Sequence, residues 1–243
     1  MTDDPNRIEG KAILVTGANR GIGQALVEEA LKRGAKRVYA GTRQTVSHLD
    51  SRVTPLPLDV TDAAQIDAAV QSVDSLDILV NNAGLALWDD LTDRVAIEQS
   101  LAVNFYGPYD VSQAFLPLLG ASRGAIVNIG SIAAWAALPV VPAYSISKAA
   151  AFSLSQALRA LLAGRGISVH AAMLGPVDTD MNRGVDMPKA PTAAVARAIF
   201  DGVQSGEDEI FPDPVSASME EDWRRGAAKA LERENAALVA EAA

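Results

Sequence analysis

Short apolar runs alternate with helix-like patterns along almost the whole of this 243-residue chain. Strands are predicted at residues 11–16, 37–41, 53–58, 76–80, 125–130, 167–174 and 208–211. Helices are predicted at 21–33, 62–73, 93–103, 105–119, 144–163, 192–203 and 220–239. Because strands joined through helices pair in parallel by right-handed crossovers, the pattern predicts an α/β fold. We expect a doubly wound parallel sheet of about seven strands with helices on both faces.

The whole chain, residues 1–243, is predicted to form a single domain. It shows no internal repeat, no low-complexity linker and no shift in composition, and its hydrophobic content of 49% is sufficient for a large core. Pro55 and Pro57 favour an edge position for the third strand. Two segments stand apart: 181–191, predicted to be a short substrate loop at the carboxyl edge of the sheet, and 217–243, predicted to be a C-terminal helical tail.

The composition excludes several classes of function. A net charge of −9 disfavours binding to nucleic acid or to an anionic membrane, because both require a basic surface. The chain has no cysteine, so it has no disulfide and no thiolate nucleophile. No apolar run is long enough to span a bilayer, and residues 1–10 do not resemble a signal sequence, so we expect a cytoplasmic protein. His48, His170 and the acidic pairs lack the spacing of metal ligands, and no metal site is predicted.

Gly17, Gly21 and Gly23 lie where the first strand turns into the first helix. Glycine at this place lets the backbone approach a pyrophosphate, while the helix N-terminus offers free N–H groups and a partial positive charge. The spacing is G-x-x-x-G-x-G, and a glycine turn with only a packing role is the alternative.

The second strand indicates which dinucleotide would bind. It ends Ala40-Gly41-Thr42-Arg43, with no acidic residue for a ribose 2′-hydroxyl before Asp50. Arg20 and Arg43 are suited to a 2′-phosphate, since guanidinium groups form bidentate contacts with phosphate. We therefore expect NADP(H) to be preferred over NAD(H). Two solvated surface arginines are the alternative.

Tyr144 and Lys148 are four residues apart and share one face of a predicted helix. A free phenol has a pKa near ~10, and a neighbouring ammonium group would lower it toward the range useful for acid–base catalysis. Ser131, at the end of a predicted strand, could donate a hydrogen bond to a substrate oxygen. Taken alone, the Tyr–Lys pair is more typical of an ordinary helix surface, and the upstream Ser131 and glycine turn favour the catalytic interpretation.

These residues resemble the short-chain dehydrogenase/reductase family over nearly the whole chain. The motifs are Thr16-Gly17-Ala18-Asn19-Arg20-Gly21-Ile22-Gly23, Asn81-Asn82-Ala83-Gly84, and Ser131 followed by Tyr144-Ser145-Ile146-Ser147-Lys148. The resemblance implies a Rossmann-type fold in which Tyr144 donates or accepts the proton and Lys148 lowers the pKa of that phenol and holds the nicotinamide ribose. It also implies that Ser131 orients the substrate oxygen and that Asn104 completes a water-linked proton relay. A homo-oligomer is implied too, commonly a tetramer, with residues 144–163 in an interface.

The resemblance further implies a set of cofactor contacts. They are Gly17, Asn19, Arg20, Gly21, Ile22, Gly23, Thr42, Arg43, Asp59, Val60, Asn82, Ala83, Gly84, Tyr144, Lys148, Val177 and Thr179. One departure is evident: the family usually has Pro-Gly at the turn after the sixth strand, whereas this chain has Leu174-Gly175-Pro176.

Apolar residues near the expected carboxyl edge predict an apolar substrate pocket. They are Trp88, Trp135, Leu138, Met181 and Met187, and core packing is an equal alternative for the two tryptophans. Trp223 is expected to pack against the C-terminal helix or a second subunit, and His170 to be a packed, hydrogen-bonded side chain within a strand.

The sequence thus predicts an NADP(H)-dependent oxidoreductase that interconverts a small apolar ketone or aldehyde with an alcohol. One alternative is a 3-oxoacyl-thioester reductase of lipid synthesis, for which Arg183 and Lys189 are the nearby basic candidates. The other is a regulator that senses a dinucleotide without catalysis. Retention of Ser131, Tyr144, Lys148 and Asn104 argues against the regulator, because the site and not the fold carries the function.

Overall fold

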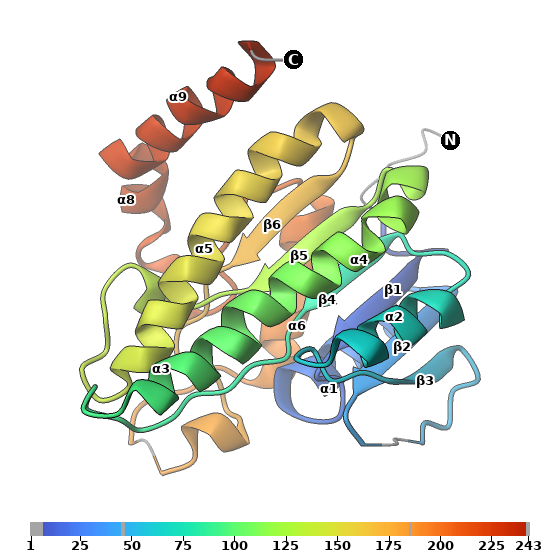
Figure 1. Ribbon diagram of the computed structural model, residues 1–243, viewed down its shortest axis with the longest axis horizontal. Coiled ribbons are helices and arrows are strands. Elements are labelled where there is room, and N and C mark those ends of the chain that lie inside the picture. The colour runs from blue at the N-terminus through green and yellow to red at the C-terminus, as the bar shows by residue number, and fades with distance from the viewer. Residues whose placement is uncertain (1–6, 45–46, 185, 242–243) are drawn as a thin grey trace.

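A computed structural model of the chain describes residues 7–44, 47–184 and 186–241 (Figure 1). Parts of three predicted segments lie outside the described residues. They are 1–6 of the polar N-terminus, 185 of the substrate loop and 242–243 of the tail.

The structure contains a seven-stranded sheet in the order β3-β2-β1-β4-β5-β6-β7, and each neighbouring pair of strands is parallel. The order reverses between β1 and β4, which is where doubly wound sheets bind ligands at their carboxyl edge. β3 lies at the edge, as its two prolines predict. The strands are β1 (Ala12–Thr16), β2 (Arg37–Thr42), β3 (Val53–Pro57), β4 (Ile78–Asn81), β5 (Ala125–Ile129), β6 (Ser168–Ala172) and β7 (Glu209–Ile210).

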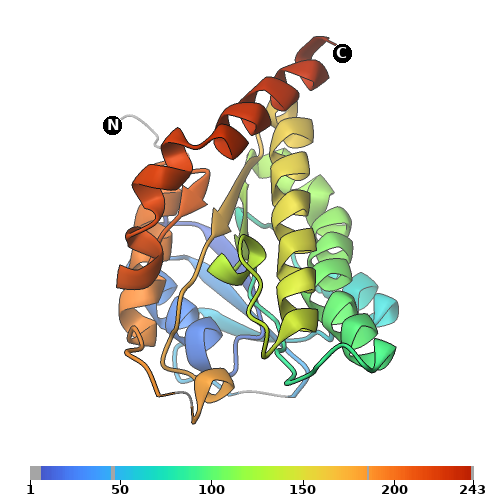
Figure 2. The ribbon, with the colours of Figure 1, turned by 90° about the vertical axis from the view of Figure 1, so that its left-hand side faces the viewer.

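Helices cover both faces of this sheet, which confirms the predicted α/β layers (Figures 1 and 2). On one face lie α1 (Gly21–Lys32) and α6 (Thr192–Gln204); on the other lie α2 (Ala63–Ser72), α4 (Gly107–Ser122) and α5 (Pro142–Leu162). The remaining helices are α3 (Arg94–Leu101), η1 (Ala102–Tyr106), η2 (Ile132–Ala134), η3 (Ala163–Arg165), η4 (Asp180–Asn182), α7 (Pro214–Ala217), α8 (Glu220–Arg225) and α9 (Ala227–Glu241).

Each face of the sheet has its own hydrophobic core. Side chains alternate along a strand, so Ile13 and Val15 pack toward α1 and α6, whereas Leu14 packs toward α4 and α5. Because both faces are covered, the inner strands consist mostly of apolar residues, as in β1. The carboxyl ends of the strands therefore form the open edge at which loops gather, at the bottom of Figures 1 and 2.

The sequence pattern predicts two helices at 93–103 and 105–119, but the structure joins them. α3 runs into the π-helical turn η1 and then into α4, with Asn104 inside that turn. A π turn inserts an extra residue without ending the helix, and such turns occur frequently at functional sites. The apparent break in the pattern is therefore a local widening of one long helix.

Two helices complete the tail. α9 contacts α5 and extends away from the carboxyl edge, and α8 leads into it (Figure 1). Across the part of the chain that the structure describes, no helix combines the length and apolar character needed to cross a bilayer.

The central strand β5 offers a test of the core. Ile126 is fully buried there, so Ile126→Val should lower the free energy of unfolding by about 0.5–1.5 kcal/mol through the methyl group lost. Urea denaturation should show this as a lower midpoint with an unchanged slope. The matched control is Leu49→Ala, which removes a fully exposed apolar side chain and should change the free energy by less than about 0.5 kcal/mol. Equal effects of the two substitutions would contradict the packing described.

Candidate active site

The turn between β1 and α1 is shaped by close backbone contacts. Gly17 has a φ of +66°, which an L side chain rarely adopts. A Cβ on Gly23 would lie 2.2 Å from the carbonyl oxygen of Gly17, so only glycine fits there. Arg20 precedes α1 without a side-chain cap, which leaves the first amides of the helix available to an anion. The turn therefore fits a phosphate group, as its sequence predicts.

The turn after β4 holds the glycine turn in place. The side-chain amide of Asn82 donates to the carbonyl oxygens of Thr16 (2.9 Å) and Gly17 (3.2 Å). In return, the Thr16 hydroxyl accepts hydrogen bonds from the backbone N–H groups of Asn82 and Ala83, each at 3.0 Å. Because these bonds join the ends of neighbouring strands, the phosphate-binding turn is fixed by the sheet and not by its own residues alone.

A third segment, which follows β6, lies against the same turn. The methyl group of Thr179 lies 3.3 Å from where a Cβ of Gly21 would be, and Asp180 forms an ion pair of 3.7 Å with Arg20. The carbonyl oxygen of Val177 accepts a hydrogen bond of 2.8 Å from the side chain of Asn182. Thr179 therefore lies beside the glycine turn, with Val177 in the same segment, and their expected contact with the nicotinamide carboxamide stays a prediction.

The unusual Gly175-Pro176 order has a local explanation. The N–H of Gly175 donates to the Asp213 carboxylate at 2.7 Å, and a Cβ on Gly175 would lie only 2.6 Å from that carboxylate. Asp213 also caps α7, which begins with Pro214. Asp213 is not among the residues predicted from the sequence, although an Asp-Pro pair is a recognisable helix start.

Ser131 and Tyr144 come together across two elements. Ser131 is buried at the end of β5, while Tyr144 is half-buried in the first turn of α5. Burial raises the pKa of the Tyr144 phenol above its usual value, and a hydrogen bond with Ser131 opposes that rise. The depressed phenol pKa expected from the sequence is therefore not seen in the protein alone, because burial outweighs the other effects.

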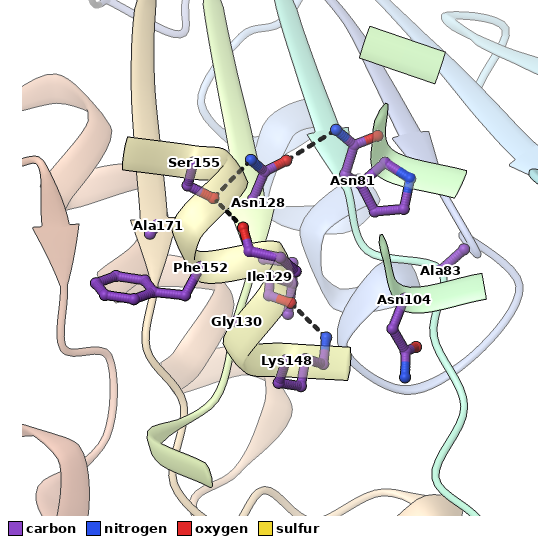
Figure 3. A pocket seen from close by; sticks show the side chains of 12 residues that line it. Asn81, Ala83, Asn104, Asn128, Ile129, Gly130, Lys148, Phe152, Ser155 and Ala171 are labelled. Carbon is purple, nitrogen blue, oxygen red and sulfur yellow. Dashed lines mark hydrogen bonds between the residues drawn. The ribbon is translucent and has the colours of Figure 1, made fainter. Parts of the chain in front are cut away.

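Lys148 lies one turn further along α5 and is only 7% exposed. Its ammonium group donates to the carbonyl oxygen of Ile129 at 2.7 Å (Figure 3). The same nitrogen lies 5.7 Å from the centre of the Tyr144 ring. Burial lowers the pKa of Lys148 to about 8. Lys148 thus neighbours the phenol as predicted, with its shortest hydrogen bond directed to the backbone of β5.

Asn104 joins two segments of the site. Its amide donates to the carbonyl oxygen of Leu85 and to the Ser147 hydroxyl, both at 2.9 Å, and its oxygen accepts from the N–H of Leu85 at 3.0 Å. Ser147 in turn donates to the carbonyl oxygen of Tyr144 at 2.7 Å. The side chain of Asn104 therefore fixes the start of α5 relative to the loop after β4.

Gly84 connects the two halves of the site. A Cβ there would lie 3.2 Å from the Asn104 oxygen and 3.9 Å from the Lys148 nitrogen, and the adjoining Ala83 would lie 2.9 Å from a Cβ on Gly17. The Asn82-Ala83-Gly84 turn consequently lies between the glycine turn and Lys148. This contact brings the expected phosphate site and the expected proton-transfer site to one edge of the sheet.

A chain of buried amides and hydroxyls adjoins Lys148, and none of its members was predicted from the sequence to be a site residue. Asn81 donates to Asn128 (2.8 Å), and Asn128 donates to Ser155 (2.9 Å) (Figure 3). Asn81 also donates to Ser112 at 3.0 Å. A cavity of about 10 Å³, enough for a single water molecule, adjoins these groups. Polar residues at Asn81 and Asn128, within otherwise apolar strands, were the available signal.

The other residues expected to contact the cofactor differ in their solvent exposure. Asn19 and Arg43 are exposed, Ile22 is half-buried, and Thr42 is buried at the end of β2. The carboxylate of Asp59 accepts hydrogen bonds from Thr61, and Val60 packs against Gly107. The structure thus offers two exposed guanidinium groups, of Arg20 and Arg43, near the ends of β1 and β2.

The expected substrate residues divide into two groups. Trp88 (72% exposed), Leu138, Met181 and Met187 are exposed on three loops at the carboxyl edge. The Trp135 ring instead stacks on Trp223, with ring centres 4.6 Å apart. For Trp135 the structure therefore agrees with core packing, which was the alternative to lining the substrate pocket. Trp223 therefore packs on the chain itself. His170 is buried and hydrogen-bonded to Glu207 and Ser168, as predicted.

Comparisons with known proteins agree with this geometry. A family model for short chain dehydrogenases matches residues 11–189. Short-chain dehydrogenase PC-15 of Penicillium crustosum is 42% identical over 187 residues, which make up 71% of this chain and 68% of that protein. Among solved structures, a short-chain dehydrogenase from Burkholderia cenocepacia in complex with NADP has a TM-score of 0.86 and 34% identity, covering 94% of this chain and 98% of its own.

A second solved structure is the NADPH-bound carbonyl reductase from chicken fatty liver. It has a TM-score of 0.76 and 28% identity, and the match covers 82% of this chain and 93% of that one. The family model, the sequence relative and the seven-stranded fold all lead to the same assignment. The chain belongs to the short-chain dehydrogenase/reductase family and is an oxidoreductase of the Rossmann type.

Proposed function

We propose that the protein is an NADP(H)-dependent oxidoreductase that interconverts a ketone or aldehyde with an alcohol. The observation that carries the proposal is the Ser131–Tyr144 pair beside Lys148, joined through Gly84 to a glycine turn that fits a phosphate. A site for proton transfer next to a dinucleotide site is the arrangement that carbonyl reduction requires.

Each residue of the site has its own role in the proposed reaction. The bound nicotinamide would supply the hydride in reduction and accept it in oxidation. The Tyr144 phenol gives its proton to the substrate oxygen in reduction, and the Ser131 hydroxyl holds that oxygen by a hydrogen bond. The Tyr144 phenol is protonated at neutral pH, as a proton donor must be, although burial raises its pKa and makes it a weaker acid than a free phenol. Lys148 adds positive charge beside the phenol, and Asn104 positions the helix turn that carries it.

The cofactor assignment rests on charge and on the shape of the backbone. Arg20 and Arg43 are exposed guanidinium groups suited to a 2′-phosphate, and β2 ends without an acidic residue. The pyrophosphate would lie on the open N-terminus of α1. The NADP and NADPH bound in the two solved relatives support this choice.

Substrate and assembly are further parts of the proposal. Exposed apolar side chains on three loops, including Trp88, Leu138 and Met181, favour a small apolar carbonyl compound, with residues 181–191 as the substrate loop. Arg183, a candidate for an acyl-carrier partner, is paired with Asp180. Exposed Ile146 and Leu161 on α5 are compatible with a homo-oligomer, either dimer or tetramer. A cytoplasmic location completes the proposal.

A substrate panel tests the reaction class. Aryl ketones such as acetophenone, acetoacetyl thioesters and the corresponding alcohols are assayed by the absorbance of NADPH and of NADH. We expect brisk turnover of aryl ketones with NADPH, slower turnover with NADH and weak turnover of the thioesters. Preference for the thioesters would favour the 3-oxoacyl-thioester reductase. Tight NADPH binding without turnover of any compound would favour the non-catalytic regulator.

Replacement of the phenol tests the mechanism. Tyr144→Phe should reduce turnover by about 10²–10⁴-fold, since general acid–base catalysis contributes that much, while NADPH binding by fluorescence titration stays near the parent value. The matched control is Tyr109→Phe, which alters an exposed tyrosine of α4 and should leave turnover unchanged. Near-normal turnover of the Tyr144 variant would refute the assigned role.

A glycine pair tests the phosphate site. A Cβ on Gly23 meets the Gly17 oxygen at 2.2 Å, so Gly23→Ala should displace the turn and weaken NADPH binding by at least about tenfold, consistent with the 1–3 kcal/mol that overpacking costs. Gly164→Ala is the control, because nothing lies within 4 Å of a Cβ there. Isothermal titration of NADPH measures both. Unchanged affinity in Gly23→Ala would exclude this turn as the phosphate site.

A further inference from the structure

We propose that Trp223, in the C-terminal tail, is a positioning residue for the reaction. By stacking on Trp135 it would hold the segment that carries Ser131 against the helix that carries Tyr144. The inference rests on the proposed function, because only in that reaction must the Ser131 hydroxyl and the Tyr144 phenol be aligned.

Four aromatic rings form one cluster beside the site. The Trp135 and Trp223 rings are nearly parallel, with 10° between their planes. Phe152 meets both edge-on, at 5.4 Å from Trp223 and 6.0 Å from Trp135, and Phe211 lies 5.9 Å from Trp135. Stacked and edge-to-face contacts are the favourable arrangements of aromatic pairs, so the cluster constrains the relative position of its members.

Two rings of the cluster, Trp135 and Phe152, lie on the elements that carry Ser131 and Tyr144. Trp135 follows η2 directly, and η2 starts at the residue after Ser131. This turn is held by hydrogen bonds from the N–H of Ala133 to the Ser131 hydroxyl (3.1 Å) and from the N–H of Trp135 to the Ile132 carbonyl (3.0 Å). Ser131 and Trp135 therefore belong to one small rigid unit.

Phe152 connects the aromatic cluster to α5, the helix that carries Tyr144 and Lys148. It lies one helical turn after Lys148 and two turns after Tyr144, so the three side chains share one face of the helix. Contact of Trp223 with both Phe152 and Trp135 bridges α5 and the Ser131 unit. A shift of either element would alter the Ser131–Tyr144 hydrogen bond.

Trp223 itself is held by a buried charge cluster. Its indole N–H donates to Glu209 at 2.9 Å, and Lys229 of α9 pairs with the same carboxylate at 2.8 Å. Glu209 and Lys229 are each 3% exposed, and Arg159 of α5 pairs with Glu209 at 2.9 Å. Buried charges that satisfy one another tolerate little displacement, so the tail is fixed to α5 and β7 around Trp223.

The stacking contact on Trp135 is made by a residue of the C-terminal tail. The family model matches residues 11–189, so it includes Trp135 and Phe152 but not Trp223. The part of the chain outside the family match thus supplies the ring that covers Trp135.

The experiment compares Trp223→Ala and Trp223→Phe with the control Leu238→Ala, which changes an exposed apolar side chain of α9. Far-ultraviolet circular dichroism should show an exciton couplet from the stacked indoles that both Trp223 variants lose and the control keeps. Hydrogen exchange of the peptide covering 130–141, which contains the amides of Ile132, Ala133 and Trp135, should accelerate in Trp223→Ala alone, with β1 to β4 unchanged.

Kinetics with acetophenone and NADPH, or with the best ketone of the panel, supply the second readout. Trp223→Ala should lower kcat by roughly 10–100-fold, with little change in NADPH affinity, because small misplacements of reacting groups carry such losses. Trp223→Phe, which keeps an aromatic ring, should restore most of kcat. In the Ser131→Ala background, Trp223→Ala should add little further loss, because both substitutions then affect the same hydrogen bond.

The outcomes separate this inference from the proposed function. Unchanged exchange in 130–141, or fully additive losses with Ser131→Ala, would overturn the role of Trp223 even in an active enzyme. Absence of turnover in the parent protein would refute the proposed function, whereas the exchange and dichroism measurements would still decide whether Trp223 holds the Ser131 segment.

Discussion

The contact between the turns that follow β1 and β4 is the constraint on which the rest of the site depends. Asn82 holds the carbonyl oxygens of Thr16 and Gly17, and Thr16 accepts the N–H groups of the opposite turn. These bonds leave no room for side chains at Gly17 or Gly23. A dinucleotide phosphate and a proton donor can share one edge only because the backbone turns pack this closely.

Burial sets the electrostatics of that edge. It raises the pKa of Tyr144 and lowers that of Lys148 to about 8, so each group is pushed toward its neutral form. The hydrogen bond between Ser131 and the phenol opposes the rise in the Tyr144 pKa, and the Lys148 ammonium group donates to the carbonyl oxygen of Ile129. In the protein alone the Tyr144 phenol is therefore protonated. The ammonium group of Lys148 lies beside its ring and is hydrogen-bonded to the backbone of Ile129.

Much of the fold follows from periodicity and composition. Uniformly apolar runs such as the one around Ile13 indicate strands buried on both faces, and helices between them require parallel pairing. Pro55 and Pro57 correctly indicate the edge strand. The π turn around Asn104 was not predictable, because an inserted residue in a continuous helix gives the same pattern as a break between two helices.

By itself, the sequence determined the layers of the fold, the glycine turn and the spacing of Tyr144 and Lys148 on one helix face, because these depend on local periodicity. Only the tertiary structure decided which residues meet across elements. It paired Trp135 with Trp223, placed Asp213 against Gly175, and joined Asn81 to Asn128 next to Lys148. Such contacts join residues far apart in the chain, and their geometry follows from how helices and strands pack, which no local pattern encodes.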